Sequence, residues 1–119
     1  MRAILWASVI FVCLLIFYLS SQPSLPLPAR ISDKFYHLME YALLGFLSVL
    51  ALRATFNISL RRALAVAILF SILYAISDEW HQSFVPGRDA SLTDLAADAA
   101  GSLMGALFAL SFRWPFFTR

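Results

Sequence analysis

Two short stretches of the chain carry all 7 of its acidic side chains, and each stretch adjoins a strongly apolar segment. The first covers residues 33–41 and the second covers residues 77–105. Ionisable side chains are costly inside a membrane, and those that occur there commonly belong to a functional site. The candidate site residues are Asp33, Lys34, His37, Glu40, Tyr41, Asp78, Glu79, Gln82, Arg88, Asp94 and Asp98.

Acid–base chemistry is one use of such a group. A carboxylic acid beside an ionised carboxylate can act as a general acid. His37 is suited to the role of general base, with its ring oriented by Glu40 or Asp78. If the protein is an enzyme, we predict that His37, Glu79 and Asp94 are catalytic. No serine, cysteine or threonine lies in a recognisable nucleophile motif.

A metal site is a second use. His37 and Glu40 are one helical turn apart, and Glu79, Asp94 and Asp98 could add oxygen ligands. However, the chain contains neither H-E-x-x-H nor a comparable metal-binding signature. We therefore predict no metal and no other cofactor.

Ligand binding is a third use. Arg88 follows a Pro-Gly turn, and its guanidinium group can hold a phosphate or carboxylate through two N–H groups. The same side chain could instead contact a lipid head group or pair with Asp89. The predicted binding residues are Asp33, Lys34, Glu40, Tyr41, Asp78, Gln82, Arg88 and Asp98.

A structural role is the alternative to all three. Asp94 fits the acidic position of a helix-capping box that opens at Ser91, and Asp33 fits a helix cap. The other acids could form a polar network that only fixes how the helices pack.

Composition identifies the environment in which these residues act. Of the 119 residues, 61% are hydrophobic and 13% are charged, whereas about a quarter of the residues in a soluble domain are charged. The net charge is only +2 and the basic residues are scattered, which argues against nucleic-acid binding. Cys13 is the only cysteine, which excludes an intrachain disulfide. We predict one integral membrane domain over residues 1–119.

The apolar segments and their breaks predict an all-α bundle of four transmembrane helices, at about residues 3–20, 33–56, 63–84 and 91–112. The first segment is too long for the apolar core of a signal peptide, and no small-x-small cleavage site follows it. Three prolines between residues 22 and 30 predict an extended linker. Val85-Pro86-Gly87 must end the third helix.

The positive-inside rule predicts the orientation. With both termini in the cytoplasm, six arginines lie on the inner side, and Arg30, Lys34 and Arg88 lie on the outer side. At 1.5 Å per residue, Glu40, Asp78 and Asp98 then lie about 20–24 Å from the inner arginines. The hydrocarbon core is about 30 Å thick. We therefore predict a polar cluster in the outer third of the membrane, on its extracytoplasmic side.

Helical spacing predicts that this cluster points inward. Asp94, Asp98, Gly101 and Gly105 share one stripe of the last helix, so the acids lie on its small-residue face. The Gly101 and Gly105 pair forms G-x-x-x-G, a motif that allows close helix packing in lipid. That packing is predicted either inside the bundle or between copies, which would make a homo-oligomer.

Two motifs resemble those of the VanZ-like family. They are D-K-x-x-H-x-x-E-Y-x-x-L-G from Asp33 to Gly45 and S-D-E-x-x-Q-x-F-x-P-G-R-x-x-S-x-x-D from Ser77 to Asp94. The resemblance covers about residues 20–106 and implies a small bacterial multi-helix inner-membrane protein. It also implies kinship with a founding member linked to teicoplanin resistance. Asp98 stands where the family often has asparagine. The positions carried over are Asp33, Lys34, His37, Tyr41, Gly45, Glu79, Gln82, Pro86, Arg88, Asp94 and Gly101.

The sequence thus leaves three functions open. The leading one is an outward-facing polar pocket that binds or acts on a lipid-like envelope molecule, such as a lipid-linked precursor or an acylated glycopeptide. The second is a membrane-embedded hydrolase or transferase that uses the His/Glu/Asp cluster. The third is a non-catalytic assembly protein whose cluster only sets helix packing.

Overall fold

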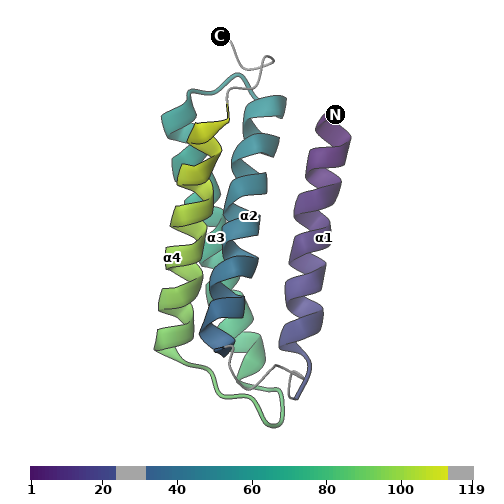
Figure 1. The fold of residues 1–119 in the computed structure, drawn as a ribbon. Helices are drawn as coiled ribbons and strands as arrows, with labels where there is room; N and C mark the ends of the chain where they lie inside the picture. Colours follow the sequence, from purple (N-terminus) through teal and green to yellow (C-terminus); the bar gives the residue numbers. More distant parts are fainter. Residues whose placement is uncertain (24–31, 113–119) are drawn as a thin grey trace.

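The chain folds into four long helices, as predicted (Figure 1). The computed structural model describes residues 1–23 and 32–112. The helices are α1 (Arg2–Ser20), α2 (Asp33–Thr55), α3 (Leu60–Gln82) and α4 (Leu92–Phe108), followed by a short 3₁₀ helix, η1 (Ala109–Ser111). Most of the linker predicted over residues 22–30, and the arginines at positions 30, 113 and 119, lie outside the described residues.

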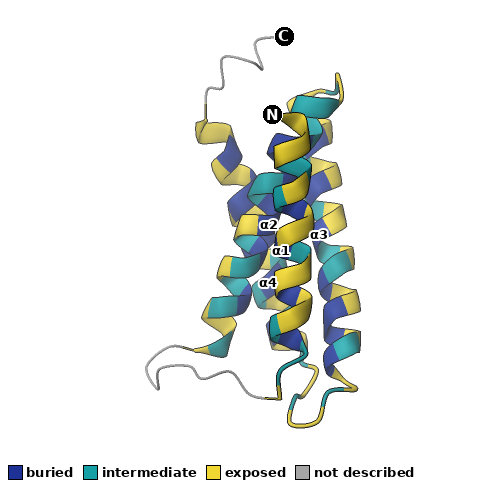
Figure 2. Cartoon of the chain, turned by 90° about the vertical axis from the view of Figure 1, so that its right-hand side faces the viewer, coloured by how far each residue is buried: buried dark blue, intermediate teal, exposed yellow. Residues whose placement is uncertain are grey.

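Three of the helices, α1, α2 and α3, are long and apolar enough to cross a membrane. The protein is therefore a multi-pass membrane protein by helix hydropathy. α4 is shorter, and η1 extends it by less than one turn. Yellow, exposed positions run along the outside of the bundle (Figure 2), and large apolar side chains account for many of them. In a bilayer these side chains would contact lipid.

Serine side chains fix where three of the helices begin. The hydroxyl oxygens of Ser32, Ser59 and Ser91 accept hydrogen bonds from backbone N–H groups in the first turns of α2, α3 and α4. The predicted cap at Ser91 is confirmed by the bond from Asp94 N at 3.0 Å. The cap at Ser59 was not foreseen, and it explains why α3 begins at Leu60 rather than near residue 63.

Tight turns explain where helices stop. α3 ends at Gln82, earlier than predicted, and the turn after it contains Gly87 at φ +82°. That conformation is strained for residues with a side chain.

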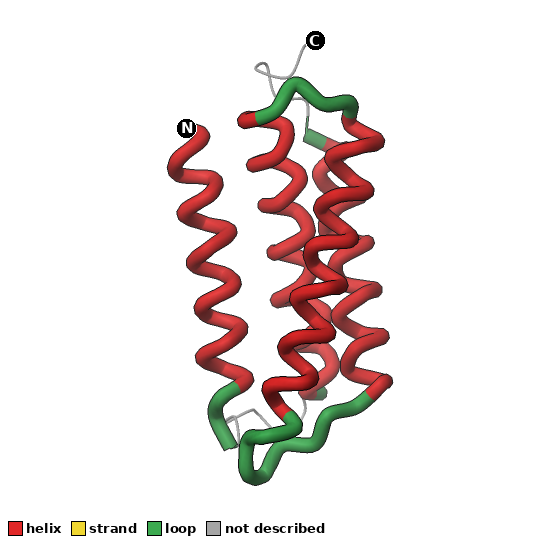
Figure 3. Tube along the Cα trace, turned by 180° about the vertical axis from the view of Figure 1, so that it is seen from behind, coloured by secondary structure: helices red, strands yellow, loops and turns green. Residues whose placement is uncertain are grey.

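The C-terminal ends of α1 and α3 and the N-terminal ends of α2 and α4 lie at one end of the bundle (Figure 3). The α2–α3 connection lies at the opposite end (Figure 3).

α2 and α4 are packed backbone to backbone by three glycines. A side-chain carbon added at Gly101 or Gly105 would overlap the backbone carbonyl of Leu38 or Ala42 on α2. One added at Gly45 would overlap the carbonyl of Ser102 on α4. The G-x-x-x-G stripe therefore packs inside the bundle. A homo-oligomer through Gly101 and Gly105 would have to displace α2.

α1 lies to one side of the other three helices (Figure 1). Its buried stripe of Val9, Val12 and Ile16 packs in one apolar core with Tyr41 and Leu44 of α2. Near the start of α1, the indole N–H of Trp6 donates a hydrogen bond of 2.8 Å to the hydroxyl of Thr55 at the end of α2. α1 is thus held along its length, and its C-terminal end is fixed beside the first turns of α2.

The glycine contacts make a first prediction. Replacing Gly105 with leucine should separate α2 from α4, because the added side chain has no space, and overpacking of this kind costs about 1–3 kcal/mol. We expect a lower midpoint of thermal unfolding in detergent, measured by loss of the monodisperse gel-filtration peak. Ala100→Leu is the matched control, because Ala100 is exposed on the same helix. Equal midpoints for the two variants would contradict the packing described.

Candidate functional site

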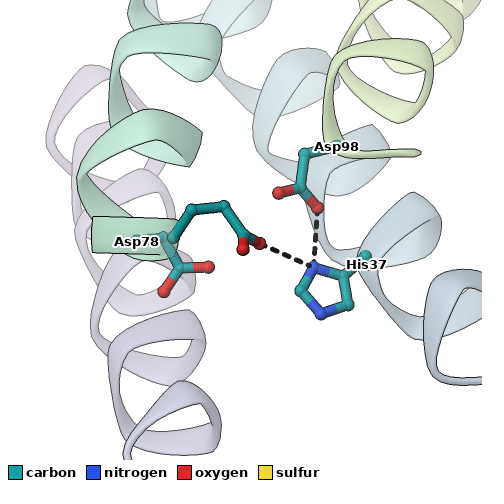
Figure 4. Close-up of side chains that lie close together, drawn as sticks. His37, Asp78 and Asp98 are labelled. Carbon is teal, nitrogen blue, oxygen red and sulfur yellow. Dashed lines mark hydrogen bonds and ion pairs between the residues drawn. The ribbon is translucent and has the colours of Figure 1, made fainter. Parts of the chain in front are cut away.

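His37 is at the centre of a polar cluster built by α2, α3 and α4. Its ring is buried, and Nδ1 lies 2.8 Å from Asp98 Oδ1 and 4.0 Å from Glu79 Oε1 (Figure 4). The first distance is that of a hydrogen bond in which the imidazole N–H donates. The other ring nitrogen, Nε2, lies 3.5 Å from Asp33 Oδ2. The imidazole therefore has a carboxylate on each side.

The two acids contributed by α3 have separate anchors. Asp78 accepts a hydrogen bond from the Tyr41 hydroxyl at 3.3 Å. Glu79 Oε2 accepts one from the backbone N–H of Ser91, the cap residue of α4, at 3.0 Å. These contacts join the end of α3 to α2 and to the start of α4. They also fix the direction of both carboxyl groups.

The two cations of the cluster each pair with an acid. Lys34 Nζ lies 3.3 Å from Asp94 Oδ1, and Arg88 Nη1 lies 3.8 Å from Asp33 Oδ1. The Ser91 hydroxyl caps the backbone N–H of Asp94 as predicted, but the Ser91 N–H donates to Glu79. The Asp94 carboxylate therefore pairs with Lys34 rather than completing the capping box. The Asp89 partner considered for Arg88 from sequence is not the one observed.

Arg88 has a structural task that the sequence did not indicate. Its Nε donates to the carbonyl of Gln22 at 2.7 Å, and its Nη2 donates to the carbonyl of Leu19 at 2.9 Å. The last carbonyls of a helix lack partners within the helix, so a guanidinium group there is stabilising. Arg88 thus caps the C-terminal end of α1 and ties it to the α3–α4 loop.

The end of α1 forms a fourth wall of the site, where sequence reasoning gave three. Gln82 donates a hydrogen bond to the Ser20 hydroxyl at 3.2 Å. His81 stacks on Phe17, with ring centroids 4.6 Å apart, and its Nε2 lies 2.9 Å from the Ser21 hydroxyl. The sequence contains a signal for this fourth wall, because Ser20, Ser21 and Gln22 end an otherwise apolar segment.

Four side chains are arranged as metal ligands. His37, Asp78, Glu79 and Asp98 each offer one ligand atom, and these atoms all lie within 4.8 Å of one another. All four residues are buried. Asp33, His37 and Asp94 form a second, partly exposed group by the same measure. The ligand set considered from sequence differs, because it included Glu40 and Asp94 and omitted Asp78.

Four of the remaining predicted residues, Asp33, Glu40, Gln82 and Arg88, line a small cavity beside this cluster. Glu40 is half-buried and makes no hydrogen bond or ion pair with another described residue. A small cavity of about 10 Å³ reaches His37, which is about the space of one water molecule. Its lining residues are Leu19, Ser20, Asp33, Tyr36, His37, Glu40, Gln82 and Arg88. The eleven predicted site residues therefore lie at one end of the bundle. Four of them, His37, Asp78, Glu79 and Asp98, have ligand atoms within 4.8 Å of one another.

A much larger hollow lies between α1 and α3. It is an apolar groove of about 530 Å³. Six of its lining residues come from α1, and Phe70 and Tyr74 come from α3. The α1 residues are Trp6, Val9, Ile10, Cys13, Leu14 and Phe17.

Comparison with known proteins gives one match. The sequence profile of the VanZ/LLP1 family matches residues 5–113, which is nearly the whole chain. No curated protein and no solved structure matches this chain. The matched segment includes α1 from its fourth residue onward, the whole of α2, α3 and α4, and every residue of the cluster described above.

Proposed function

The chain belongs to the VanZ/LLP1 family, and on that premise we propose that it binds a lipid-like molecule of the cell envelope. The acyl or prenyl chain of this ligand would lie in the groove between α1 and α3. Its polar head would lie at the mouth of the small cavity beside His37. A lipid-linked precursor and an acylated glycopeptide both have this chemistry.

The groove is the observation that carries the proposal. Its volume of about 530 Å³ is in the range of ligand sites, and its lining is apolar. Surface-exposed apolar hollows of this size on a membrane protein suit a hydrocarbon chain. Two aromatic residues of α3, Phe70 and Tyr74, close one side, and Tyr74 is fixed by a hydrogen bond to the Cys13 carbonyl.

The groove also leads toward the polar cluster. Cys13, Phe17 and Ser20 follow one helical stripe of α1, because they are spaced by four and then three residues. Phe17 lines the groove, while Ser20 lines the small cavity. An amphiphile lying along this stripe would pass from apolar to polar surroundings over one turn.

Charge at the mouth suits an anionic head group. The Lys34 side chain is 54% exposed although it pairs with Asp94. Arg88 has N–H groups left after its contacts with two carbonyls, and it lines the cavity. A phosphate or carboxylate at this cavity could therefore meet the Arg88 guanidinium group, which is the role predicted for Arg88.

We place this mouth on the outer side of the membrane. The positive-inside rule supports that orientation, because the α2–α3 end carries Arg53, Arg61 and Arg62. Both termini would then be cytoplasmic. The ligand would come from the outer leaflet, where lipid-linked wall precursors and glycopeptides act.

The pure packing role has less support. A polar network that only sets helix packing is expected to give each buried polar group a hydrogen-bond partner, since a buried group without one weakens the fold. Glu79 Oε1 and Asp98 Oδ2 are buried without a hydrogen-bond partner.

The enzyme alternative would use His37, Glu79 and Asp94, and turnover of labelled envelope lipid by the purified protein would establish it. Resistance to teicoplanin does not follow from the family alone.

The groove makes a second prediction. Leu14→Trp should fill the groove and reduce by several-fold the lipid that copurifies with the protein, measured by mass spectrometry of extracts per mole of protein. Leu15→Trp is the matched control, because Leu15 is an exposed neighbour outside the groove. We expect the control to retain the lipid of the unaltered chain. Equal lipid content in both variants would refute the groove as the binding site.

Orientation makes a third prediction. In a Cys13→Ala background, a cysteine replacing Asp89 should react with a membrane-impermeant maleimide in intact cells, because Asp89 is exposed at the cluster end. A cysteine replacing Asn57, exposed in the α2–α3 connection, should react only after the cells are opened. The reverse labelling pattern would overturn the orientation.

A further inference from the structure

We propose that His37, Asp78, Glu79 and Asp98 bind one divalent transition-metal ion. The four ligand atoms lie within 4.8 Å of one another. Around a tetrahedral metal ion with bonds of about 2.1 Å, ligand atoms are about 3.4 Å apart. Side-chain rotations that move each ligand atom by up to about 0.7 Å would therefore complete the site.

Buried oxygens without partners point to a missing ligand. Asp98 is fully buried, and its Oδ2 has no hydrogen-bond partner. Glu79 is 7% exposed, and its Oε1 likewise has no hydrogen-bond partner. Buried polar atoms without a hydrogen-bond partner are rare in folded proteins. A bound ion is one explanation for them. Both carboxyl groups belong to the same four-residue set.

The balance of charge leads to the same result. Lys34 pairs with Asp94 and Arg88 pairs with Asp33, so neither cation pairs with the three inner carboxyl groups. Among the residues that the structure describes, His37 is the basic side chain in contact with those groups, with Glu40 and Tyr41 nearby on α2 and His81 near Asp78 on α3. Burying carboxylates without countercharge is strongly unfavourable. A divalent cation would offset most of this charge.

The surroundings of the ligands are those of a metal site. Metal-binding histidines commonly direct their second nitrogen to a carboxylate, which orients the ring. Here Nε2 of His37 faces Asp33 Oδ2 at 3.5 Å while Nδ1 faces the cluster. The backbone of Ser91 and the hydroxyl of Tyr41 hold Glu79 and Asp78 from behind. Binding would require Nδ1 to release its proton, so affinity should fall as the pH is lowered.

The donor set indicates the class of ion. One imidazole and three carboxyl groups suit Zn²⁺ or Mn²⁺, whereas thiolate-seeking ions lack a sulfur ligand here. Cys13 lies in the α1–α3 groove and not in this cluster. This inference does not rest on the lipid proposal, since ion binding can be measured in detergent without any envelope lipid.

Metal binding to the purified full-length chain makes the fourth prediction. The protein in detergent is treated with chelator, freed of it, and equilibrated with Zn²⁺ or Mn²⁺ before gel filtration and elemental mass spectrometry. We expect one ion per chain. His37→Gln and Glu79→Gln should each weaken binding at least tenfold, since even changes to groups behind the ligands cost about 10–100-fold. Asp89→Asn is the matched control, because Asp89 is an exposed acid outside both groups of candidate ligands, and it should bind as the unaltered chain does.

Failure of the unaltered chain to bind either ion would overturn the proposal. So would unchanged affinity in both ligand variants, or an equal loss in the Asp89→Asn control. If the ligand variants do not fold, the X-ray absorption spectrum of the unaltered Zn²⁺ complex decides the question. Scattering from a bound imidazole is expected, and a zinc ion with oxygen ligands alone would refute the ligand set.

Discussion

The contact between His37 of α2 and Asp98 of α4 is the interaction on which the polar cluster depends. It joins two helices at 2.8 Å, and no water or long side chain intervenes. Such a short link between helices requires the backbones to be close at this level. Gly101 supplies that closeness, because it lies one turn after Asp98 and touches the backbone of Leu38, the residue after His37. The glycine stripe and the buried His37–Asp98 hydrogen bond therefore depend on each other.

The rest of the cluster follows from this pairing of α2 with α4. Once α2 and α4 are in contact, the end of α3 is positioned by Glu79, which reaches the cap residue of α4. Asp78 then reaches Tyr41 on α2. The end of α1 closes the last side through Gln82 and Arg88. Four helix ends thus surround a few buried acids, and the desolvation cost of those acids has to be met by partners, protons or a bound cation.

Helical periodicity made much of this predictable. The apolar segments predicted four helices, and spacing of three or four residues predicted which polar side chains point inward. Asp94, Asp98, Gly101 and Gly105 are indeed all buried on one face of α4. The family was also identified correctly from the two motifs, since its profile covers residues 5–113. The roles assigned to individual site residues remain predictions.

Other features could not be read from spacing. Periodicity gives the face of a residue but not the rotamer of its side chain, so it could not show that Asp78 rather than Glu40 completes the four-residue set. Arg88 lies in a loop, and its hydrogen bonds go to carbonyls that any residue could supply. The polar end of α1 was separated from the cluster by a linker of unknown path. These contacts depend on tertiary packing, which local patterns do not encode.

A double-mutant cycle between His37 and Asp98 tests the central claim most directly. The cycle compares His37→Gln, Asp98→Asn and the double variant with the unaltered chain, all in the presence of chelator, by equilibrium unfolding in detergent. If the contact organises the cluster, the effects will be non-additive, with a coupling energy of about 1 kcal/mol or more. Additive effects on the free energy of unfolding would contradict this account.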